Sequence, residues 1–360
     1  MKKKSLFFRL VLPLFLLAVI IRLVAKLSRP FADFYNRTVS AACRFLMAKL
    51  TGWFSFSLAE ILVCLIPVFL ILIIVFGIRS IKNGKRFRRY VAATLSVPMV
   101  IYTLFVATYA VGYQTTPLAD RLGLRDEAVS ADELYNTMKW VRDEANALSS
   151  SFTLTENGTV MPYDWDTMTD KLNEAYASLS EEYPFLQSHN TRLKRIMLSD
   201  PMTYTGIVGV YSFFTGESNI NTTYPDYSTV FTAAHEMAHQ RGIAPENEAN
   251  FVAFLACTHA SDPYLRYVGY LNMADYLANA LYKADRTRYR EMMNGYNTVL
   301  RTEVVAYSEC YRAHRNETVH NVSSAMNNSY LISQGTPGEV AYGLVVDLAV
   351  AYYNEVIAAN

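Results

Sequence analysis

Apolar residues are concentrated in the first third of the chain, in three stretches at about residues 6–25, 57–78 and 90–112. A helix needs about 20 residues to cross the hydrocarbon core of a bilayer, and each stretch is long enough. The pattern therefore predicts three transmembrane helices. The first stretch is also compatible with a cleaved signal peptide, but Lys26, Arg29 and Pro30 stand where a cleavage site would be needed, which favours a permanent anchor.

The basic residues predict how these helices are oriented. Six of them lie in the short loop between the second and third stretches, at positions 79–89, and three more follow the first methionine. Loops rich in Lys and Arg stay in the cytoplasm, so residues 114–360 are expected outside it. Besides Lys26, the loop at 26–52 contains four basic residues that oppose this orientation, but the six basic residues of the shorter loop outnumber them. The four are Arg29, Arg37, Arg44 and Lys49.

The remainder of the chain has mainly helical periodicity. A β-rich run at residues 194–223, broken by turn residues, predicts two or three strands. Ser130 and Glu133 form a capping-box pattern at the start of one helix. The fold class expected is mainly α, with a membrane domain at 1–113 and an α+β domain at 114–360 that has one small sheet. Helices are expected at 130–148, 164–183, 262–284, 287–315 and 338–359.

The stretch "HEMAH", from His235 to His239, follows the predicted sheet. No helix breaker precedes Gly242, so the two histidines are expected one turn apart on one helix face, where both can bind a single ion. Zinc held by two histidines and a carboxylate lowers the pKa of a bound water to around 7. Glu236 would then take the proton of that water as general base.

A zinc site of this kind needs a third protein ligand, and Glu246 or Glu248 can supply it. Gly242 is expected to end the first helix, and Pro245 suits the start of a second one that returns toward it. Both glutamates also suit the positive end of a helix dipole, so the residues alone leave the choice open.

The combination of "HEMAH" with "ENEAN" resembles the gluzincin metallopeptidases. This resemblance implies that Glu246 is the third zinc ligand, with Glu248 as the second choice, and that the domain is zincin-like. It also places Asn250 where those enzymes have a supporting aspartate. The spacing between His239 and Glu246 is shorter than gluzincins usually have, and Arg241 replaces a residue that is typically hydrophobic.

A second resemblance covers almost the whole chain. It is carried by segments in this order: "FSLAEIL", "TTPLADRLGL", "FTGESNIN", "HEMAHQRG", "ENEANFVAFLAC", "DPYLRYVGYL" and "AYGLVVDLAVAY". They resemble an uncharacterised bacterial membrane family, domain of unknown function 3810. The resemblance implies three membrane spans and a zincin-like domain in the bacterial cytoplasmic membrane, and it names no substrate.

Two functions follow as hypotheses. The first is a membrane-anchored zinc metallopeptidase that hydrolyses peptide bonds outside the cytoplasmic membrane, with a peptide or protein as substrate and the bilayer as its other partner. The second is a non-catalytic sensor or scaffold that keeps the zincin fold. The presence of His235, Glu236 and His239 together favours the enzyme. A formal net charge of +1 gives no indication of nucleic acid.

A peptidase also needs a strand that binds the peptide and a group that stabilises the transition state, and the sequence offers candidates for both. The run "GVYSFFTGESNIN" is a candidate edge strand for binding an extended peptide. Four residues are candidates for stabilising the transition state, and the sequence favours none of them over the others. They are His314, His320, Tyr330 and Tyr342.

The orientation generates a direct test. A reporter enzyme that works only after export should be active when it is fused after Thr116. The basic loop stays in the cytoplasm, so the third transmembrane helix is expected to end outside it. Activity from a cytoplasm-only reporter at the same position would reverse the orientation.

Overall fold

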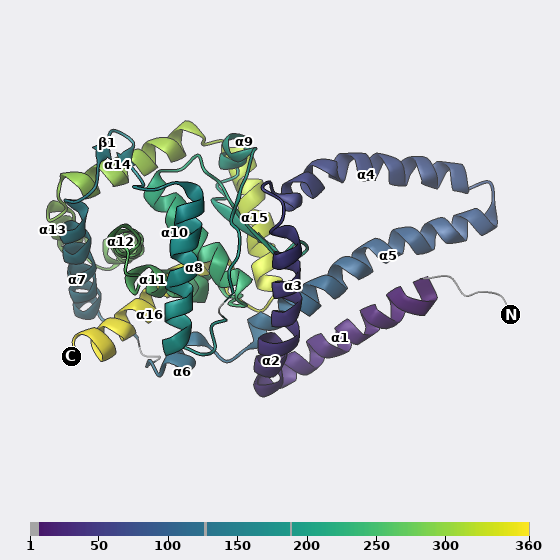
Figure 1. Ribbon diagram of the computed structural model, residues 1–360, viewed down its shortest axis with the longest axis horizontal. Coiled ribbons are helices and arrows are strands. Elements are labelled where there is room, and N and C mark those ends of the chain that lie inside the picture. The colour runs from purple at the N-terminus through teal and green to yellow at the C-terminus, as the bar shows by residue number, and fades with distance from the viewer. Residues whose placement is uncertain (1–6, 126–127, 188, 360) are drawn as a thin grey trace. The chain divides into compact units, whose positions relative to one another are not determined.

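The computed structural model describes residues 7–125, 128–187 and 189–359 of the 360-residue chain. The chain divides into two compact units (Figure 1). The first comprises Met1–Thr115 with the short segment Ser212–Glu217, and the second comprises Thr116–Tyr211 with Ser218–Asn360. Each unit is described separately below.

The first unit is helical. Its helices are α1 (Leu12–Leu27), α2 (Arg29–Tyr35), α3 (Ala41–Thr51), α4 (Leu58–Ser80) and α5 (Gly84–Thr108). Short π-helical turns precede α1 (η1, Phe7–Val11) and α3 (η2, Asn36–Ser40), and a 3-10 turn follows α5 (η3, Ala110–Gln114). The loop at 26–52, for which no element was expected, is therefore mostly helical.

Within the described residues, four segments are long and apolar enough to cross a membrane: Arg9–Leu27, Leu58–Ser80, Gly84–Thr108 and Gly338–Ile357. The first three correspond to the predicted stretches. None of the most apolar window of Leu58–Ser80 is buried, whereas 41% of the window in Gly338–Ile357 is buried. A long apolar helix without buried residues in this window needs an apolar surrounding, so the first unit has the character of a membrane protein.

Arg44 is a fully buried cation in the first unit. Its guanidinium donates hydrogen bonds to the side chain of Asn36 at 2.9 Å, to the backbone carbonyl of Asn36 at 3.0 Å and to that of Thr108 at 2.8 Å. Arg22 donates likewise to the carbonyl of Ala110. In the sequence, Arg44 is one of the basic residues of the loop at 26–52. In the structure this side chain is instead buried and hydrogen-bonded within the first unit.

The second unit contains most of the elements. Its helices are α6 (Leu118–Leu122), α7 (Ala131–Ser149), α8 (Trp165–Glu182), α9 (Ser199–Thr203), α10 (Asp226–Gln240), α11 (Glu246–Thr258), α12 (Pro263–Ala284), α13 (Arg286–Asn294), α14 (Thr298–Ala313), α15 (Glu317–Ser333) and α16 (Val345–Tyr352). The 3-10 turn η4 (Gly338–Leu344) precedes α16, and the π-helical turn η5 (Tyr353–Ile357) follows it.

The core of the second unit is built around α11. Every residue from Ala249 to Cys257 is buried, because α8, α10, α12 and α16 pack around this helix. Helix α12 is covered in turn by α7, and Figure 1 shows α12 end-on between these neighbours. Burial of an apolar helix on all sides contributes roughly 1.5–3 kcal/mol for each large side chain, so this cluster fixes the positions of α10 and α11.

Three short strands form a small sheet, as the β-rich run predicts. They are β3 (Lys194–Arg195), β4 (Gly209–Ser212) and β5 (Glu217–Ile220), in the order β3-β5-β4. Strands β3 and β5 are parallel, with Lys194 opposite Asn219. Strand β4 therefore lies at an edge of this sheet. A separate antiparallel hairpin, β1 (Leu154–Thr155) with β2 (Gly158–Thr159), was not expected.

The prediction of one helix at 287–315 is wrong. Helix α13 ends at Asn294, and α14 begins at Thr298 after Asn297, whose side chain accepts a hydrogen bond from the amide of Leu300 at 3.0 Å. Asparagine favours this capping position over a helix interior. At Gly295 a side chain would meet the guanidinium of Arg142 at 2.5 Å, so the break is also a point of close packing.

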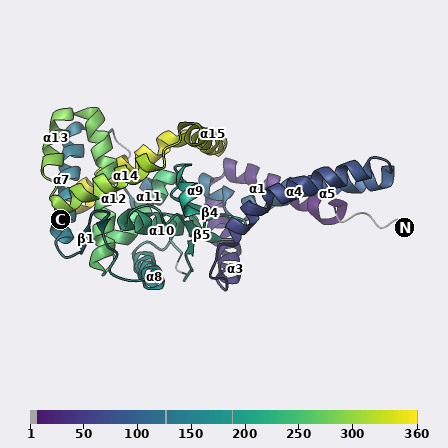
Figure 2. The ribbon, with the colours of Figure 1, turned by 90° about the horizontal axis from the view of Figure 1, so that it is seen from above.

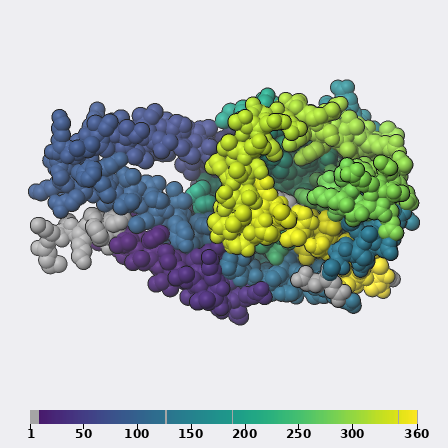
Figure 3. Space-filling view, turned by 180° about the vertical axis from the view of Figure 1, so that it is seen from behind, coloured from purple at the N-terminus to yellow at the C-terminus, as the bar shows by residue number. Residues whose placement is uncertain are grey.

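Helix α15 is a second difference from the predictions. Most of its residues are exposed, and its sequence has no regular apolar stripe, so periodicity gives no signal for it. Figure 2 shows α14 and α15 following one another along one side of the second unit. Figure 3 shows the same lime and yellow C-terminal helices on the outer face of this unit.

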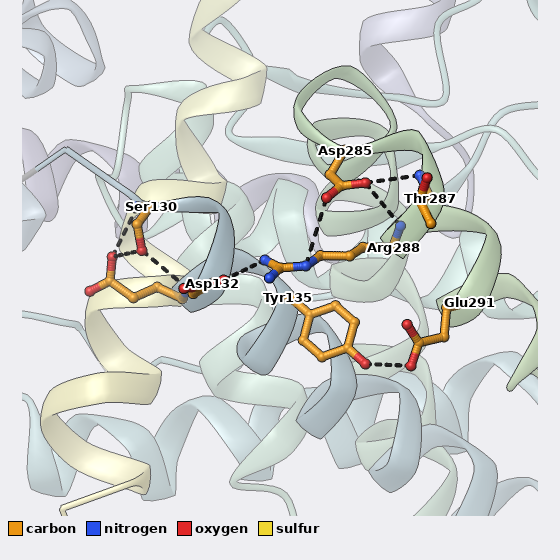
Figure 4. Close-up of polar contacts among 8 residues, drawn as sticks. Ser130, Asp132, Tyr135, Asp285, Thr287, Arg288 and Glu291 are labelled. Carbon is orange, nitrogen blue, oxygen red and sulfur yellow. Dashed lines mark hydrogen bonds and ion pairs between the residues drawn. The ribbon is translucent and has the colours of Figure 1, made fainter.

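The capping box at the start of α7 is present as predicted. The Ser130 hydroxyl accepts from the amide of Glu133 at 3.2 Å, and the Glu133 carboxylate accepts from the amide of Ser130 at 2.9 Å. Figure 4 shows this cap beside two links from α7 to α13, the ion pair of Asp132 with Arg288 and the hydrogen bond that Tyr135 donates to Glu291.

Replacement of the cap should loosen this end of α7. Ser130→Ala removes the acceptor for the Glu133 amide, at a cost of about 1 kcal/mol. Amide hydrogen exchange in the first turn of α7 should accelerate about fivefold, which corresponds to that free energy. Ser151→Ala, at an exposed position after the same helix, is the control and should leave this exchange unchanged. Equal exchange rates in Ser130→Ala and the unaltered protein would contradict the assignment of the cap.

Candidate metal centre

Helix α10 carries both histidines of the "HEMAH" stretch on one face. Small and apolar residues on its other faces are fully buried, among them Ala233, Ala234, Met237 and Ala238. This packing holds the backbone, and the imidazole centroids of His235 and His239 lie 4.5 Å apart. The two rings are therefore close enough to bind one ion.

A tight turn brings the next helix back to these rings. Gly242 adopts a φ of 94°, a conformation that favours glycine, and the amide of Ile243 bonds to the carbonyl of Ala238 at 3.2 Å. Pro245 is the N-cap of α11, and Glu246 is its first residue. The turn also orients a ring, because Nδ1 of His239 lies 2.7 Å from the carbonyl oxygen of Ile243. A proton on Nδ1 leaves Nε2 available as a metal ligand.

Three ligand atoms converge at the turn. The Glu246 Oε2 atom lies 3.2 Å from Nε2 of His235 and 3.4 Å from Nε2 of His239. Among the described residues, these three were found to offer ligand atoms that all lie within 4.8 Å of one another. Ligands about 2.1 Å from a tetrahedral zinc ion lie about 3.4 Å apart, so the spacing and the donor set fit zinc.

The charges of this cluster stabilise each other. Burial works against the charged imidazole of His239, but the Glu246 carboxylate outweighs it and raises the pKa of His239 to about 9. Burial likewise favours the neutral acid at Glu246, yet the two histidines hold its pKa well below the ordinary value. A divalent cation would compete with protons for the lone pairs of the imidazole nitrogens and of the Glu246 carboxylate, as it does at metal sites in general.

Glu236 lies beside the three convergent residues, and its side chain is buried. Its carboxylate accepts a hydrogen bond from the backbone amide of Tyr211 on β4. The Oε2 atom has no hydrogen-bond partner among the described residues. Burial raises the pKa of Glu236, although the neighbouring histidines oppose that shift. One oxygen of the carboxylate is thus held by the protein, and the other is left unpartnered.

Glu248 has a different place. Its Oε1 atom accepts a hydrogen bond from the amide of Leu118 at 2.9 Å, at the start of α6. Burial raises the pKa of Glu248 to about 7. The structure therefore brings Glu246 to the histidines and uses Glu248 to join α11 to α6.

The two residues that depart from the gluzincin pattern, Arg241 and Asn250, are both buried. Arg241 is buried, and it donates hydrogen bonds to the carbonyl of Met237 at 3.1 Å and to that of His189 at 3.0 Å, with its guanidinium over the ring of Tyr176. It thus fixes the end of α10. Asn250 is buried as well, but its Nδ2 atom has no hydrogen-bond partner among the described residues, and neither has Nδ1 of His235.

The other candidate residues lie in varied settings. His314 is bonded to Asp200, with 2.9 Å between Nε2 and Oδ1, and His320 packs against Gly206. The side chain of Tyr342 lies outside the described residues.

Sequence reasoning missed two groups near the centre. They are the amide of Tyr211 and the hydroxyl of Tyr276 on α12, whose pKa is raised by burial and also by the charge of Glu246. A backbone amide has no side-chain signature, and Tyr276 is one of 26 tyrosines, so neither carried a usable signal.

Comparison with known proteins defines the family. The chain belongs to a protein family of unknown function, DUF3810, whose model matches residues 35–350. No curated protein and no solved structure matches the chain. The matched range includes α4, α5 and all the residues of the candidate metal centre.

The geometry separates the two acidic candidates. Metal content of the purified full-length chain in detergent should fall to background in Glu246→Ala, because the remaining two histidines make a poor zinc site. Glu248→Ala should retain its metal, since this carboxylate bonds Leu118 and not the histidines. Elemental analysis by mass spectrometry measures both. Loss of metal in Glu248→Ala with retention in Glu246→Ala would exchange the two roles.

Proposed function

We propose that this protein is a membrane-anchored, zinc-dependent metallopeptidase of zincin type that hydrolyses peptide bonds outside the cytoplasmic membrane. The observation that carries the proposal is the convergence of His235, His239 and Glu246 at distances that suit tetrahedral zinc, with Glu236 beside them. An ion pair of purely structural use does not require a second carboxylate, with one oxygen unpartnered, at the same place.

Each residue has a distinct task in this proposal. His235, His239 and Glu246 would hold the ion, which would supply Lewis-acid activation of a water molecule and of the scissile carbonyl. The hydrogen bond from Nδ1 of His239 to Ile243 keeps that ring in the tautomer that leaves Nε2 for the ion. Glu236 accepts the proton of the attacking water at Oε2 and later delivers it to the leaving amine.

Strand β4 provides a place for the substrate backbone. It lies at the edge of the small sheet, and the carbonyls of Val208 and Val210 accept hydrogen bonds from Asn221 and Asn219 on the β5 side. The main-chain groups of Gly209 and Tyr211 therefore point to the other edge, where Tyr211 meets Glu236. An extended peptide that adds to this edge would run past the general base.

The apolar helices and the basic loop support the proposed location of the reaction. The first unit anchors the chain in a bacterial cytoplasmic membrane, and the basic loop at 79–89 keeps its own end in the cytoplasm. The second unit then faces the outside, where peptides and proteins are the substrates.

Glu236→Gln tests the proposal, because glutamine keeps the shape of the side chain and removes the basic oxygen. Zinc content and folding should stay nearly unchanged, while cleavage falls roughly 10²-fold or more, the usual contribution of a positioned general base. Peptides released from membranes that carry the unaltered protein or the variant can be compared by mass spectrometry without knowledge of the substrate.

Glu156→Gln is the matched control, since this glutamate is exposed and belongs to the hairpin β1–β2 region. It should give the peptide profile of the unaltered protein. Identical profiles from all three proteins, each with bound zinc, would contradict catalysis and favour a non-catalytic sensor or scaffold.

A further inference from the structure

Gly209 on β4 is packed directly against Glu236. A Cβ atom added at this position would lie 2.7 Å from Oε1 and 2.9 Å from Cγ of Glu236, and 2.6 Å from Cγ2 of Thr232. Ordinary van der Waals contact begins at 3.4 Å. No other residue type therefore fits at position 209 with Glu236 in its present place.

Space is the reason for this glycine, and backbone conformation is not. The glycines with positive φ near the strand are Gly206 and Gly216, whereas Gly209 has an ordinary strand conformation. Glycine weakens a strand interior, and its presence there commonly marks the close approach of another group. The group that approaches Gly209 is the side chain proposed as the general base.

The neighbouring backbone completes the arrangement. The amide of Tyr211 is hydrogen-bonded to the Glu236 carboxylate. The oxygen nearest Gly209 is Oε1, and Oε2 has no hydrogen-bond partner among the described residues. Strand β4 thus holds the carboxylate of the base by a hydrogen bond and by contact, and Oε2 is left unpartnered.

We propose that Gly209 is a positioning residue for Glu236: its missing side chain lets β4 approach α10 closely enough to hold the carboxylate, by contact with Oε1 and by the Tyr211 amide, and so to direct Oε2 toward the reacting water. The inference rests on the proposed function. With alanine at 209, the carboxylate must retreat by about 0.7 Å to reach ordinary contact. Displacements of about 1 Å at a reacting group can lower rates by about 10²-fold.

The test uses the full-length protein in detergent and acetohydroxamate as probe. A hydroxamate binds zinc through its two oxygens and gives its hydroxyl proton to an adjacent carboxylate, so its affinity reports where Glu236 lies. Gly209→Ala should retain zinc but bind the probe about tenfold more weakly, the cost of one charge-assisted hydrogen bond. Gly343→Ala is the control, because a Cβ atom there meets nothing within 4 Å.

Thr232→Ser provides a second background, since it removes the Cγ2 atom that a residue at 209 would also meet. In this background, Gly209→Ala should lower the thermal unfolding midpoint when Glu236 is present and lower it much less with Glu236→Ala. That comparison measures the contact itself and remains valid if Gly209→Ala alone fails to fold.

The outcomes separate this inference from the proposed function. Unchanged hydroxamate affinity in Gly209→Ala, loss of zinc in that variant, or an equal fall of the unfolding midpoint with and without Glu236 would each overturn the role of Gly209. A protein that binds no zinc even with its sequence unaltered would instead contradict the metallopeptidase, while the unfolding comparison still decides whether Gly209 positions Glu236.

Discussion

The turn between α10 and α11 is the constraint on which the rest of the centre depends. Within a few residues it ends one helix, starts the next and returns the chain toward the first. Gly242 permits the reversal through its positive φ, and the carbonyl of Ile243 orients the ring of His239. Glu246 follows at the first position of α11. A longer connection would leave the third carboxylate free to move, so the short spacing from His239 to Glu246 produces a compact site.

Burial of this turn decides its electrostatics. Charged groups removed from water are stable only when paired, and the carboxylate of Glu246 with the ring of His239 forms such a pair. Arg241 is a buried charge only a short way along the chain, and its guanidinium contacts backbone carbonyls and the ring of Tyr176 instead. The positive charge of Arg241 therefore fixes the helix end, and it leaves the carboxylate of Glu246 to the histidines.

The sequence predicts those parts of the protein that depend on local rules. The cap formed by Ser130 and Glu133, the pairing of His235 with His239 on one face and the small sheet before α10 all follow from spacing within a few residues. Long-range contacts are different. Gly295 packs against Arg142, some 150 positions earlier, and the choice between the two glutamates depends on which one meets Leu118. The periodicity of apolar residues contains no information on such long-range contacts.

The bond between Glu248 and Leu118 also has a mechanical consequence. The chain leaves the first unit at Thr115, and Leu118 follows only a few residues later. Glu248, on the other side of that bond, is two residues from Glu246 along α11. Tension applied to the chain at Thr115 would consequently reach the first turn of α11 through this hydrogen bond, in addition to the packing of the buried Leu118 side chain. The geometry of the three convergent residues is therefore mechanically connected to the point where the second unit begins.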